Sequence, residues 1–252
     1  MKKATQNASV LLLPLLILFG FSTQAEEAQS PGVAEVFQCS YNDGKDWDDL
    51  MSARDHFVKQ SAKAGITPPP SYVWSRYKGG PPLDFIWFSI HADLAAFGAN
   101  TDAGAASSDM ASVLPRFYTV ASCREELGTI NTVFQRDEPD GGSVFLSSYA
   151  CNYRHGAGPG SQADLNSHIV GTLGEMGDNA PQAVYTIEPI TTGPNSRDVY
   201  LFDTHQSATG WTNFQGAITG EADGQALARH FEAVLDCDQS LWNAEQVVGG
   251  DG

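Results

Sequence analysis

The chain has few basic residues and lacks the short motifs on which most enzyme classes depend. Its 252 residues include 14 Lys and Arg against 30 Asp and Glu, which gives a formal net charge of −16. That negative field repels phosphate backbones and anionic membranes, so we expect no nucleic-acid partner. No GxSxG elbow, HExxH pair, phosphate-binding loop or Gly-rich dinucleotide fingerprint occurs. Serine hydrolase, zincin, P-loop and Rossmann chemistry is therefore not expected.

Long apolar runs are also scarce. The one notable run, residues 10–21, is shorter than the roughly 20 residues that span a bilayer as a helix. Lys2 and Lys3 precede it, and Thr-Gln-Ala at 23–25 offers a small-x-small cleavage site. This pattern predicts a secretory signal peptide over residues 1–25, and hence a periplasmic or secreted protein without a membrane span after cleavage. An uncleaved N-terminal anchor is the alternative.

The chain repeats a pattern of residues across its two halves. Cys39 opens Cys-Ser-Tyr-Asn-Asp-Gly, and Cys151 opens Cys-Asn-Tyr-Arg-His-Gly. The segment 84–91 has its counterpart at 198–205, and both begin with Asp and end with His. We interpret this as a tandem duplication. The expected organisation is a signal peptide (1–25), a flexible segment (26–32), repeat 1 (33–137), a linker (138–142), repeat 2 (143–248) and a flexible tail (249–252).

Cysteine is sparse, and its use follows the repeat. The four cysteines form no CxxC, no CxxCH and no other metal-ligand spacing, so we expect no metal site and no covalently attached haem. In an oxidising compartment they predict disulfides. The repeat assigns Cys39 to Cys123 and Cys151 to Cys237, which leaves no cysteine as a nucleophile. Bridges between the repeats are the alternative, because sequence alone does not prove connectivity.

Each repeat shows the same predicted order, β-α-β-β-α-β, which is that of a ferredoxin-like unit. In that topology the first strand lies antiparallel beside the fourth, so the paired cysteines come close together. We expect the first helix of each repeat to begin at an Asp cap, Asp48 or Asp49 in one and Asp164 in the other. A looser segment follows each third strand. The predicted strands are 33–41, 72–77, 84–90, 129–135, 144–153, 183–190, 198–203 and 241–248, and the predicted helices are 47–64, 163–176 and one ending at each of Cys123 and Cys237.

Helices on one face of such a sheet leave its other face uncovered, and two copies bury that face by packing sheet to sheet. With this order, the passage from Trp87 to Phe97 resembles the dimeric α/β-barrel superfamily, which includes antibiotic-biosynthesis monooxygenase-like and stress-responsive barrel proteins. The resemblance implies an α+β fold, a pseudo-dimeric barrel in one chain that is itself monomeric. Some members bind haem, so it also raises haem ligation by His91 or His205; without a haem motif we expect no cofactor.

Two histidines are the candidate catalytic residues. His91 and His205 both follow the third strand of a repeat, where a histidine can act as a general base or bind a ligand, or can cap a loop. Aromatic side chains near them suit a pocket for a small apolar ligand. The candidate ligand-binding residues are Trp87, Phe88, Phe97, Phe202 and Trp211.

Two acidic features favour structural roles. The acidic cluster at 43–49 lacks the glycine position and downstream Glu of an EF-hand loop, and it predicts a solvated turn ending in an Asp helix cap. Asp84 and Asp198 follow turn-forming residues, and we expect them to accept backbone N–H groups there.

Three functions remain open from the sequence. The first is a non-enzymatic exported protein that binds a small apolar ligand, or a protein partner, through a barrel cavity or rim. The second is a cofactor-independent oxygenase or isomerase with His91 or His205 as its base. The third is a structural module of the cell envelope. A cavity that holds a histidine among aromatic side chains favours the first two, and a filled barrel favours the third.

Overall fold

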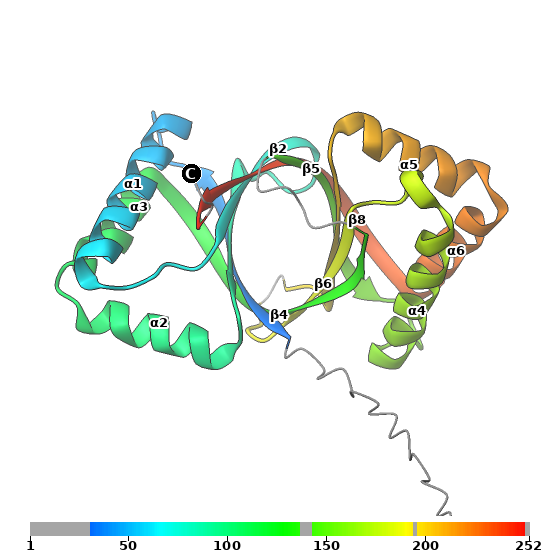
Figure 1. Ribbon diagram of the computed structural model, residues 1–252, viewed down its shortest axis with the longest axis horizontal. Helices are drawn as coiled ribbons and strands as arrows, with labels where there is room; N and C mark the ends of the chain where they lie inside the picture. The colour runs from blue at the N-terminus through cyan, green and yellow to red at the C-terminus, as the bar shows by residue number, and fades with distance from the viewer. Residues whose placement is uncertain (1–30, 137–142, 194–195, 250–252) are drawn as a thin grey trace, which may run out of the picture.

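The computed structural model describes residues 31–136, 143–193 and 196–249, and it shows an eight-stranded antiparallel barrel with helices on its outside (Figure 1). The predicted signal peptide and linker, and nearly all of the predicted flexible segment and tail, lie outside the described residues. No described helix is long and apolar enough to cross a membrane. The strands are β1 (Gly32–Tyr41), β2 (Ser71–Gly79), β3 (Phe85–His91), β4 (Ala121–Gln135), β5 (Val144–Tyr153), β6 (Ala183–Pro189), β7 (Val199–His205) and β8 (Leu235–Val248).

The expected barrel is confirmed, and the strand pairs show how it closes. The order around it is β1-β3-β2-β8-β5-β7-β6-β4, and all neighbours are antiparallel. Pairing of β2 with β8 and of β4 with β6 joins the N-terminal half (β1 to β4) to the C-terminal half (β5 to β8). The halves therefore share main-chain hydrogen bonds, and closure leaves no unpaired sheet edge.

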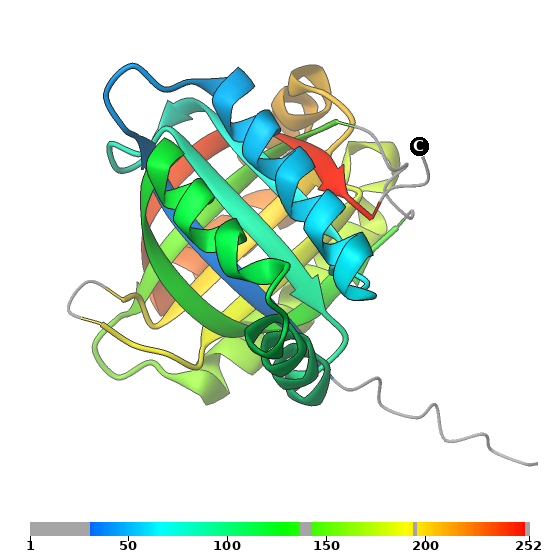
Figure 2. The same ribbon diagram turned by 90° about the vertical axis from the view of Figure 1, so that its left-hand side faces the viewer.

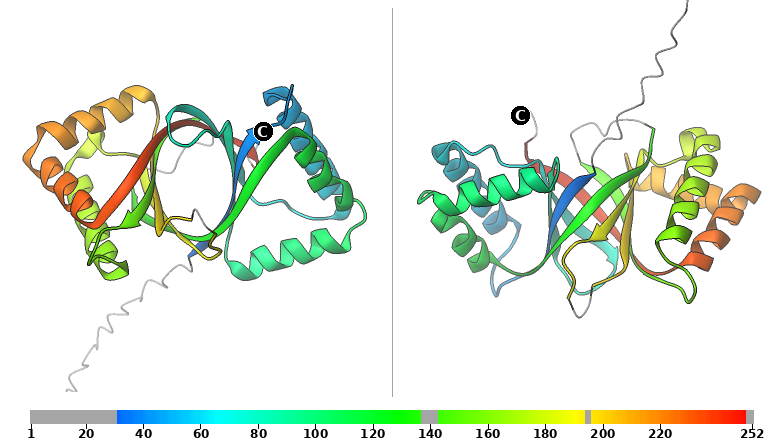
Figure 3. Two further views of the ribbon diagram at one scale, coloured as in Figure 1. Left: turned by 180° about the vertical axis from the view of Figure 1, so that it is seen from behind. Right: turned by 90° about the horizontal axis from the view of Figure 1, so that it is seen from below.

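Helices flank the barrel on two opposite sides, three to each half (Figures 1 and 3). In the N-terminal half, α1 and α3 lie side by side across the outer face of the sheet (Figure 2). The helices are α1 (Trp47–Ala64), α2 (Leu94–Ala106), α3 (Val113–Val120), α4 (Pro159–Glu175), α5 (Ala208–Gly220) and α6 (Ala222–Val234), with the 3₁₀ turns η1 (Met110–Ser112) and η2 (Gly177–Asn179).

The segments after the third strands, predicted to be loose, are the helices α2 and α5. Each begins at a capping side chain: Asp93 accepts a hydrogen bond from the Ala96 N–H (2.7 Å), and Ser207 accepts one from the Gly210 N–H (3.2 Å). Helix α2 is rich in Ala and Gly and has no buried residue, so its sequence carries no amphipathic stripe. That absence explains why periodicity did not predict a helix, although the resemblance of the Trp87–Phe97 passage to the superfamily implied a short helical segment there.

Two predicted helix caps are wrong. Helix α1 is capped by Asp46, whose carboxylate accepts hydrogen bonds from the N–H groups of Asp48 and Asp49. Helix α4 begins at Pro159, before the predicted Asp164, because proline suits the first turn of a helix, where its missing N–H leaves no bond unmade. The acidic cluster thus ends in a helix cap, as predicted, and the described residues contain no group of three potential metal ligands.

The last strand of each half begins earlier than predicted, at Ala121 and Leu235. The cysteines therefore lie inside strands instead of between helix and strand. Cys39 is the direct β1 neighbour of Cys123 on β4, and Cys151 on β5 stands opposite Cys237 on β8 in the same way. Both predicted disulfides are confirmed, Cys39–Cys123 and Cys151–Cys237.

Asp84 and Asp198 do accept backbone N–H groups, although from a strand and not from the turn. The Asp84 carboxylate accepts from the Tyr41 N–H, and that of Asp198 from the Tyr153 N–H, both at 2.8 Å. Each bond fixes the end of the first strand of its half against the start of the third strand. Tyr41 and Tyr153 also pack against the cluster that contains the disulfide of their half.

Side chains alternate between the two faces of the barrel wall, which creates three apolar clusters. One lies beneath the helices of the N-terminal half, and a second beneath those of the C-terminal half. The third fills most of the barrel interior, where Trp74 stacks on Phe88 with ring centroids 4.9 Å apart and Phe202 stacks on Tyr185 at the same distance. The barrel is therefore largely a packed core.

Candidate functional site

A large cavity lies outside the barrel, between the N-terminal half of the sheet and its helices. Its volume is about 510 Å³. Strands β1 and β3 form its floor, α1 and α3 form two walls, and α2 with η1 closes another side. The side chains that matter most for its chemistry are Glu35, Phe37, Arg54, Phe57, Trp87, Ser89, His91, Asn100, Thr101, Met110 and Phe117.

Strand alternation decides which residues of β3 reach this cavity. Trp87, Ser89 and His91 point outward under the helices, whereas Ile86 and Phe88 point into the barrel. The helices then determine how much space remains above the outward residues. Helix α2 buries none of its side chains, and Figure 1 shows it set apart from α1 and α3.

His91 is the one buried imidazole in this cavity. The residue is 5% exposed, and neither ring nitrogen has a hydrogen-bond partner within the described structure. Its nearest charged group is Glu35, whose Oε2 lies 3.7 Å from Nε2, beyond hydrogen-bond distance. The ring of Phe97 from α2 meets the imidazole edge to face, with centroids 5.2 Å apart. A buried polar ring without a partner is costly, so its nitrogens are available to a ligand.

The neighbours of His91 on the floor are already engaged with one another. The Trp87 indole N–H donates to the Ser89 hydroxyl at 3.1 Å, and the Ser71 and Ser89 hydroxyls lie 2.9 Å apart. Arg54, on the α1 side, donates to the Val247 carbonyl at 3.1 Å. These bonds hold Trp87, Ser89 and Arg54 in place, whereas neither nitrogen of the His91 ring has a hydrogen bond.

The C-terminal half places its histidine in a different setting. His205 Nε2 lies 2.6 Å from an Asp203 carboxylate oxygen, and the Ser147 hydroxyl is 2.7 Å from both oxygens of that carboxylate. All three residues are buried. Phe214 from α5 packs on His205, with ring centroids 5.5 Å apart. His205 is therefore a buried residue whose ring is hydrogen-bonded within the core.

The acidic residue near the histidine stands on different strands in the two halves. Glu35 on β1 pairs in register with Ser89 on β3, whereas Ser147 on β5 pairs with Asp203 on β7. In the C-terminal half, Asp203 is thus two residues before His205 and bonds to it directly. In the N-terminal half the serine holds that position and bonds to tryptophan, which leaves His91 free.

The surroundings of Asp203 also affect a nearby phenol. Burial, followed by the negative charge of Asp203, raises the pKa of Tyr149 well above its usual range. The Tyr149 hydroxyl accepts a hydrogen bond from the Gln239 side-chain amide at 3.1 Å. Phe37 occupies the matching position in the N-terminal half, where it lines the cavity. The C-terminal half therefore has a bonded polar cluster where the N-terminal half has an apolar wall.

The structure separates the five aromatic residues that were predicted to share one pocket. Trp87 lines the cavity, and Phe97 contacts His91. Phe88 and Phe202 meet inside the barrel, with ring centroids 5.8 Å apart. Trp211, on α5, packs near Phe145 on the far side of the molecule. Of the five, only Trp87 lines the cavity of a candidate histidine, His91, while Phe97 contacts the ring of that histidine.

Several cavity residues were not predicted. Glu35 and Phe37 alternate along β1, a pattern that places them on one face but does not reveal that the face is hollow. Arg54 and Phe57 come from α1, and Phe117 from α3. The distance between these helices and the sheet depends on tertiary packing, so no sequence signal identifies them as lining residues.

Comparison with known proteins supports the fold and little beyond it. No protein-family model matches the sequence, and no curated protein matches it either. Solved structures with a similar fold are dimeric α/β-barrel proteins that cover most of the chain, so the expected resemblance is confirmed at the level of fold.

Three such structures illustrate the range. A protein assigned as a monooxygenase from Fusobacterium nucleatum has a TM-score of 0.57 and 12% identity, over 88% of this chain and 98% of that one. A mutant chlorite dismutase from Candidatus Nitrospira defluvii has 0.52 and 6%, over 86% and 93%. A dye-decolorizing peroxidase from Bacteroides thetaiotaomicron has 0.52 and 9%, over 87% and 94%.

Proposed function

We propose that this protein binds a small, mostly apolar organic molecule in the cavity beneath α1, α2 and α3, with a polar group of that molecule bonded to His91. The proposal rests on one observation, that the two ring nitrogens of the buried His91 have no hydrogen-bond partner. The site differs from the barrel cavity or rim expected from the sequence, since the barrel interior is largely filled by its own side chains.

The size and lining of the cavity support this proposal. Its volume of about 510 Å³ lies within the range of small-molecule sites, which is roughly 300–1,000 Å³. Phe37, Phe57, Trp87 and Phe117 supply aromatic surface, and His91 supplies a point of orientation. An apolar wall with few polar groups is the usual composition of such a site.

A second candidate function is catalysis, with His91 as a general base. Glu35 favours it, because a carboxylate 3.7 Å from Nε2 stabilises the imidazolium that forms when the ring accepts a proton. The ligand would then carry an acidic O–H or C–H bond facing the ring. A cofactor-independent oxygenase or isomerase needs such a step, and the shared fold with an assigned monooxygenase agrees with it without demonstrating it.

Haem suits this cavity only in part. A haem iron takes an imidazole nitrogen as an axial ligand, and His91 offers one. However, Arg54 is the one other basic side chain among the described lining residues, and it is bonded to Val247 and to Asp55. The lining thus offers little compensation for the two carboxylates of a haem. A haem titration therefore serves as a comparison in the ligand test.

We further propose that the chain is a tandem pair of ferredoxin-like repeats, over 33–137 and 143–248, that acts as a monomeric pseudo-dimer. Both halves have the strand order 4-1-3-2 and carry one disulfide between strands 1 and 4. Two disulfides also support the periplasmic or secreted location, since such bonds persist in oxidising compartments. A purely structural role in the envelope would require no cavity of this size.

The ligand test uses protein purified from the periplasm. Native mass spectrometry should detect a bound organic molecule, and His91→Phe should lose it while His155→Phe, which changes an exposed loop histidine, retains it. If wild-type protein carries no ligand and shows no thermal shift with small phenols, ketones or haem, the proposal is wrong. For the catalytic candidate, Glu35→Gln should lower turnover while leaving ligand affinity within about twofold.

A further inference from the structure

The cavity beneath α1, α2 and α3 contains a carboxylate that has no Lys or Arg partner. Glu35 on β1 lines this cavity, and its side chain is 32% exposed. Among the described residues its nearest basic group is the His91 ring, whose Nε2 lies 3.7 Å from Oε2. That Nε2 is buried and has no hydrogen-bond partner. Two atoms that can accept hydrogen bonds therefore stand side by side, and the described residues donate to neither.

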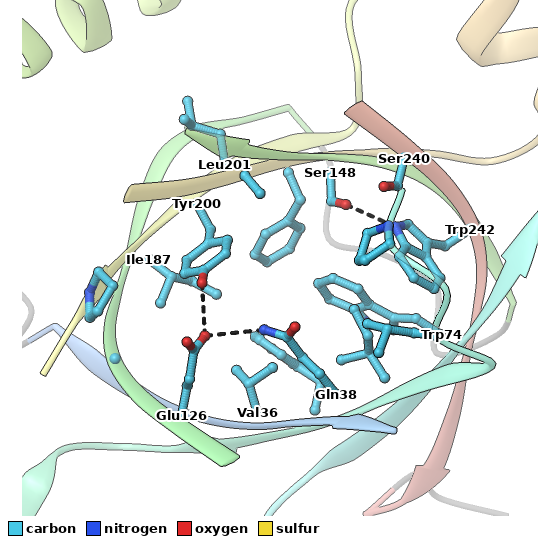
Figure 4. Close-up of a pocket in the computed structure, with 18 of the residues that line it drawn as sticks. Val36, Gln38, Trp74, Glu126, Ser148, Ile187, Tyr200, Leu201, Ser240 and Trp242 are labelled. Carbon is cyan, nitrogen blue, oxygen red and sulfur yellow. Dashed lines mark hydrogen bonds between the residues drawn. The ribbon is translucent and has the colours of Figure 1, made fainter. Parts of the chain in front are cut away.

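The carboxylate inside the barrel shows the opposite situation. Glu126 Oε2 accepts hydrogen bonds from the Tyr200 hydroxyl at 2.9 Å and from the Gln38 amide at 3.1 Å (Figure 4). Its Oε1 forms an ion pair with Arg124 at 3.0 Å. The charge and the lone pairs of Glu126 are thus used within the protein, whereas those of Glu35 are open to a ligand.

A second carboxylate adds to the negative charge beside the cavity. Burial, followed by the negative charge of Glu35, raises the pKa of the Glu125 carboxyl on β4. Glu125 accepts a hydrogen bond from the Tyr118 hydroxyl, which brings no positive charge. Arg54, the one basic side chain besides His91 in the described lining, is bonded to the Val247 carbonyl. The local field therefore disfavours an anionic ligand and favours a cation, as does the net charge of −16.

An aromatic wall lies next to Glu35 on the same two strands. Glu35 pairs with Ser89, and the next outward pair is Phe37 with Trp87, about 7 Å further along the strands. Phe117 from α3 meets both of these rings edge to face, with centroids 5.9 Å apart in each case. A ligand whose aromatic ring lies among these side chains can reach Glu35 with a short alkyl arm.

We propose that the ligand of this cavity is an arylalkylamine, with its ring among Phe37, Trp87 and Phe117 and its protonated primary amine bonded to Glu35 and His91. This inference rests on the proposed function and names the ligand class of the same site. One nitrogen can bond to both acceptors, because their separation of 3.7 Å is less than twice the usual N–H···O distance of about 2.9 Å. A hydroxyl has a single hydrogen to donate, whereas an ammonium group donates to both atoms and compensates the carboxylate charge.

The test compares three probes of similar shape by calorimetry and by tryptophan fluorescence on the full disulfide-bonded protein. They are 2-phenylethylamine, the neutral 2-phenylethanol and the anionic phenylacetate. The amine should bind about tenfold more tightly than the alcohol, because its hydrogen bonds are charge-assisted. Phenylacetate should bind most weakly, since its carboxylate meets Glu35.

The outcomes separate this inference from the proposed function. If the alcohol binds as tightly as the amine and His91→Phe loses both, the inference is overturned and the proposed site stands. Tighter binding of phenylacetate than of the amine overturns the inference in the same way. If none of the three probes binds, the inference is wrong, and the test with phenols, ketones and haem decides the proposed function separately.

A charge-matched pair of variants assigns the selectivity to Glu35. Glu35→Gln keeps the shape of the side chain, so the amine should lose about tenfold in affinity while the alcohol changes by less than about twofold. Glu232→Gln, at an exposed position of α6 in the other half, alters the net charge equally and should leave both affinities unchanged. An equal loss in the two variants would show that the field of the whole chain attracts the amine, and would overturn the inference. The catalytic candidate predicts instead an affinity within about twofold for Glu35→Gln, so this variant also distinguishes an amine ligand from a neutral substrate.

Discussion

Replacing the two histidines by phenylalanine should have opposite effects on stability. His91 has no hydrogen bond to lose, and an unsatisfied buried polar group costs about 1–3 kcal/mol. Phenylalanine keeps the ring contact with Phe97 and removes that cost. We therefore expect His91→Phe to stabilise the protein by about 1–2 kcal/mol, while abolishing ligand binding, as is common when a functional site is relieved of strain.

The same change at His205 removes a bonded partner. It leaves the buried Asp203 carboxylate without its imidazole partner, and breaking a buried pair by removing one member costs about 3–5 kcal/mol. Replacing both members of the pair, as in His205→Phe with Asp203→Leu, should recover most of the loss, since a buried polar pair exchanged for apolar residues is often neutral.

Thermal unfolding measures both effects. With about 2–4 °C per kcal/mol for a chain of this size, the Tm should rise by about 2–8 °C for His91→Phe and fall by about 6–20 °C for His205→Phe. Ligand-free protein is the appropriate sample, because a copurified ligand stabilises the wild type by mass action. A fall of equal size in both single variants would refute the reasoning, since it would show that His91 is bonded in the folded protein.

Three further predictions concern pH, covalent links and strand ends. Folding raises the pKa of Tyr149, so the stability that this residue contributes is fully present below about pH 10 and is lost at higher pH by about 1.4 kcal/mol per pH unit. In Tyr149→Phe, the free energy of unfolding measured in urea should therefore depend less on pH between about pH 9 and 11. Each disulfide closes a long loop, with a sequence separation of 84 or 86. Cys123→Ala or Cys237→Ala should therefore lower the free energy of unfolding by about 4.5 kcal/mol. An effect below about 1 kcal/mol in urea titrations would contradict this prediction. Asp84→Ala should cost about 1 kcal/mol and speed amide exchange at Tyr41, whereas unchanged exchange would show that the Asp84 bond does not hold the end of β1.

The repeated pattern predicted more of the fold than any single motif did. Matching cysteines at 39 and 151, and at 123 and 237, predicted both disulfides and the neighbourhood of first and fourth strands. Runs rich in aromatic and β-branched residues located β3 and β7 to within a few residues. These features follow from residue types and from their matching positions in the two halves, and the sequence shows both.

Helix α2 shows where local reasoning ends. Its run of Ala and Gly has no apolar stripe for periodicity to detect, although alanine favours a helix and Asp93 caps its start. The starts of β4 and β8 were misplaced for a related reason, because polar residues there face outward from a strand whose pairing depends on distant partners.

The sequence by itself determined the order of the eight strands, the disulfide pairing and the presence of two candidate histidines at matching positions. Only the tertiary structure distinguished those histidines. Asp203, two residues before His205, bonds to the ring of that histidine, whereas Ser89, two residues before His91, bonds to Trp87 instead. Which of these bonds forms depends on contacts across strands and on how closely the helices cover the sheet. Those contacts leave His91 unpaired beside a cavity and His205 enclosed in a core.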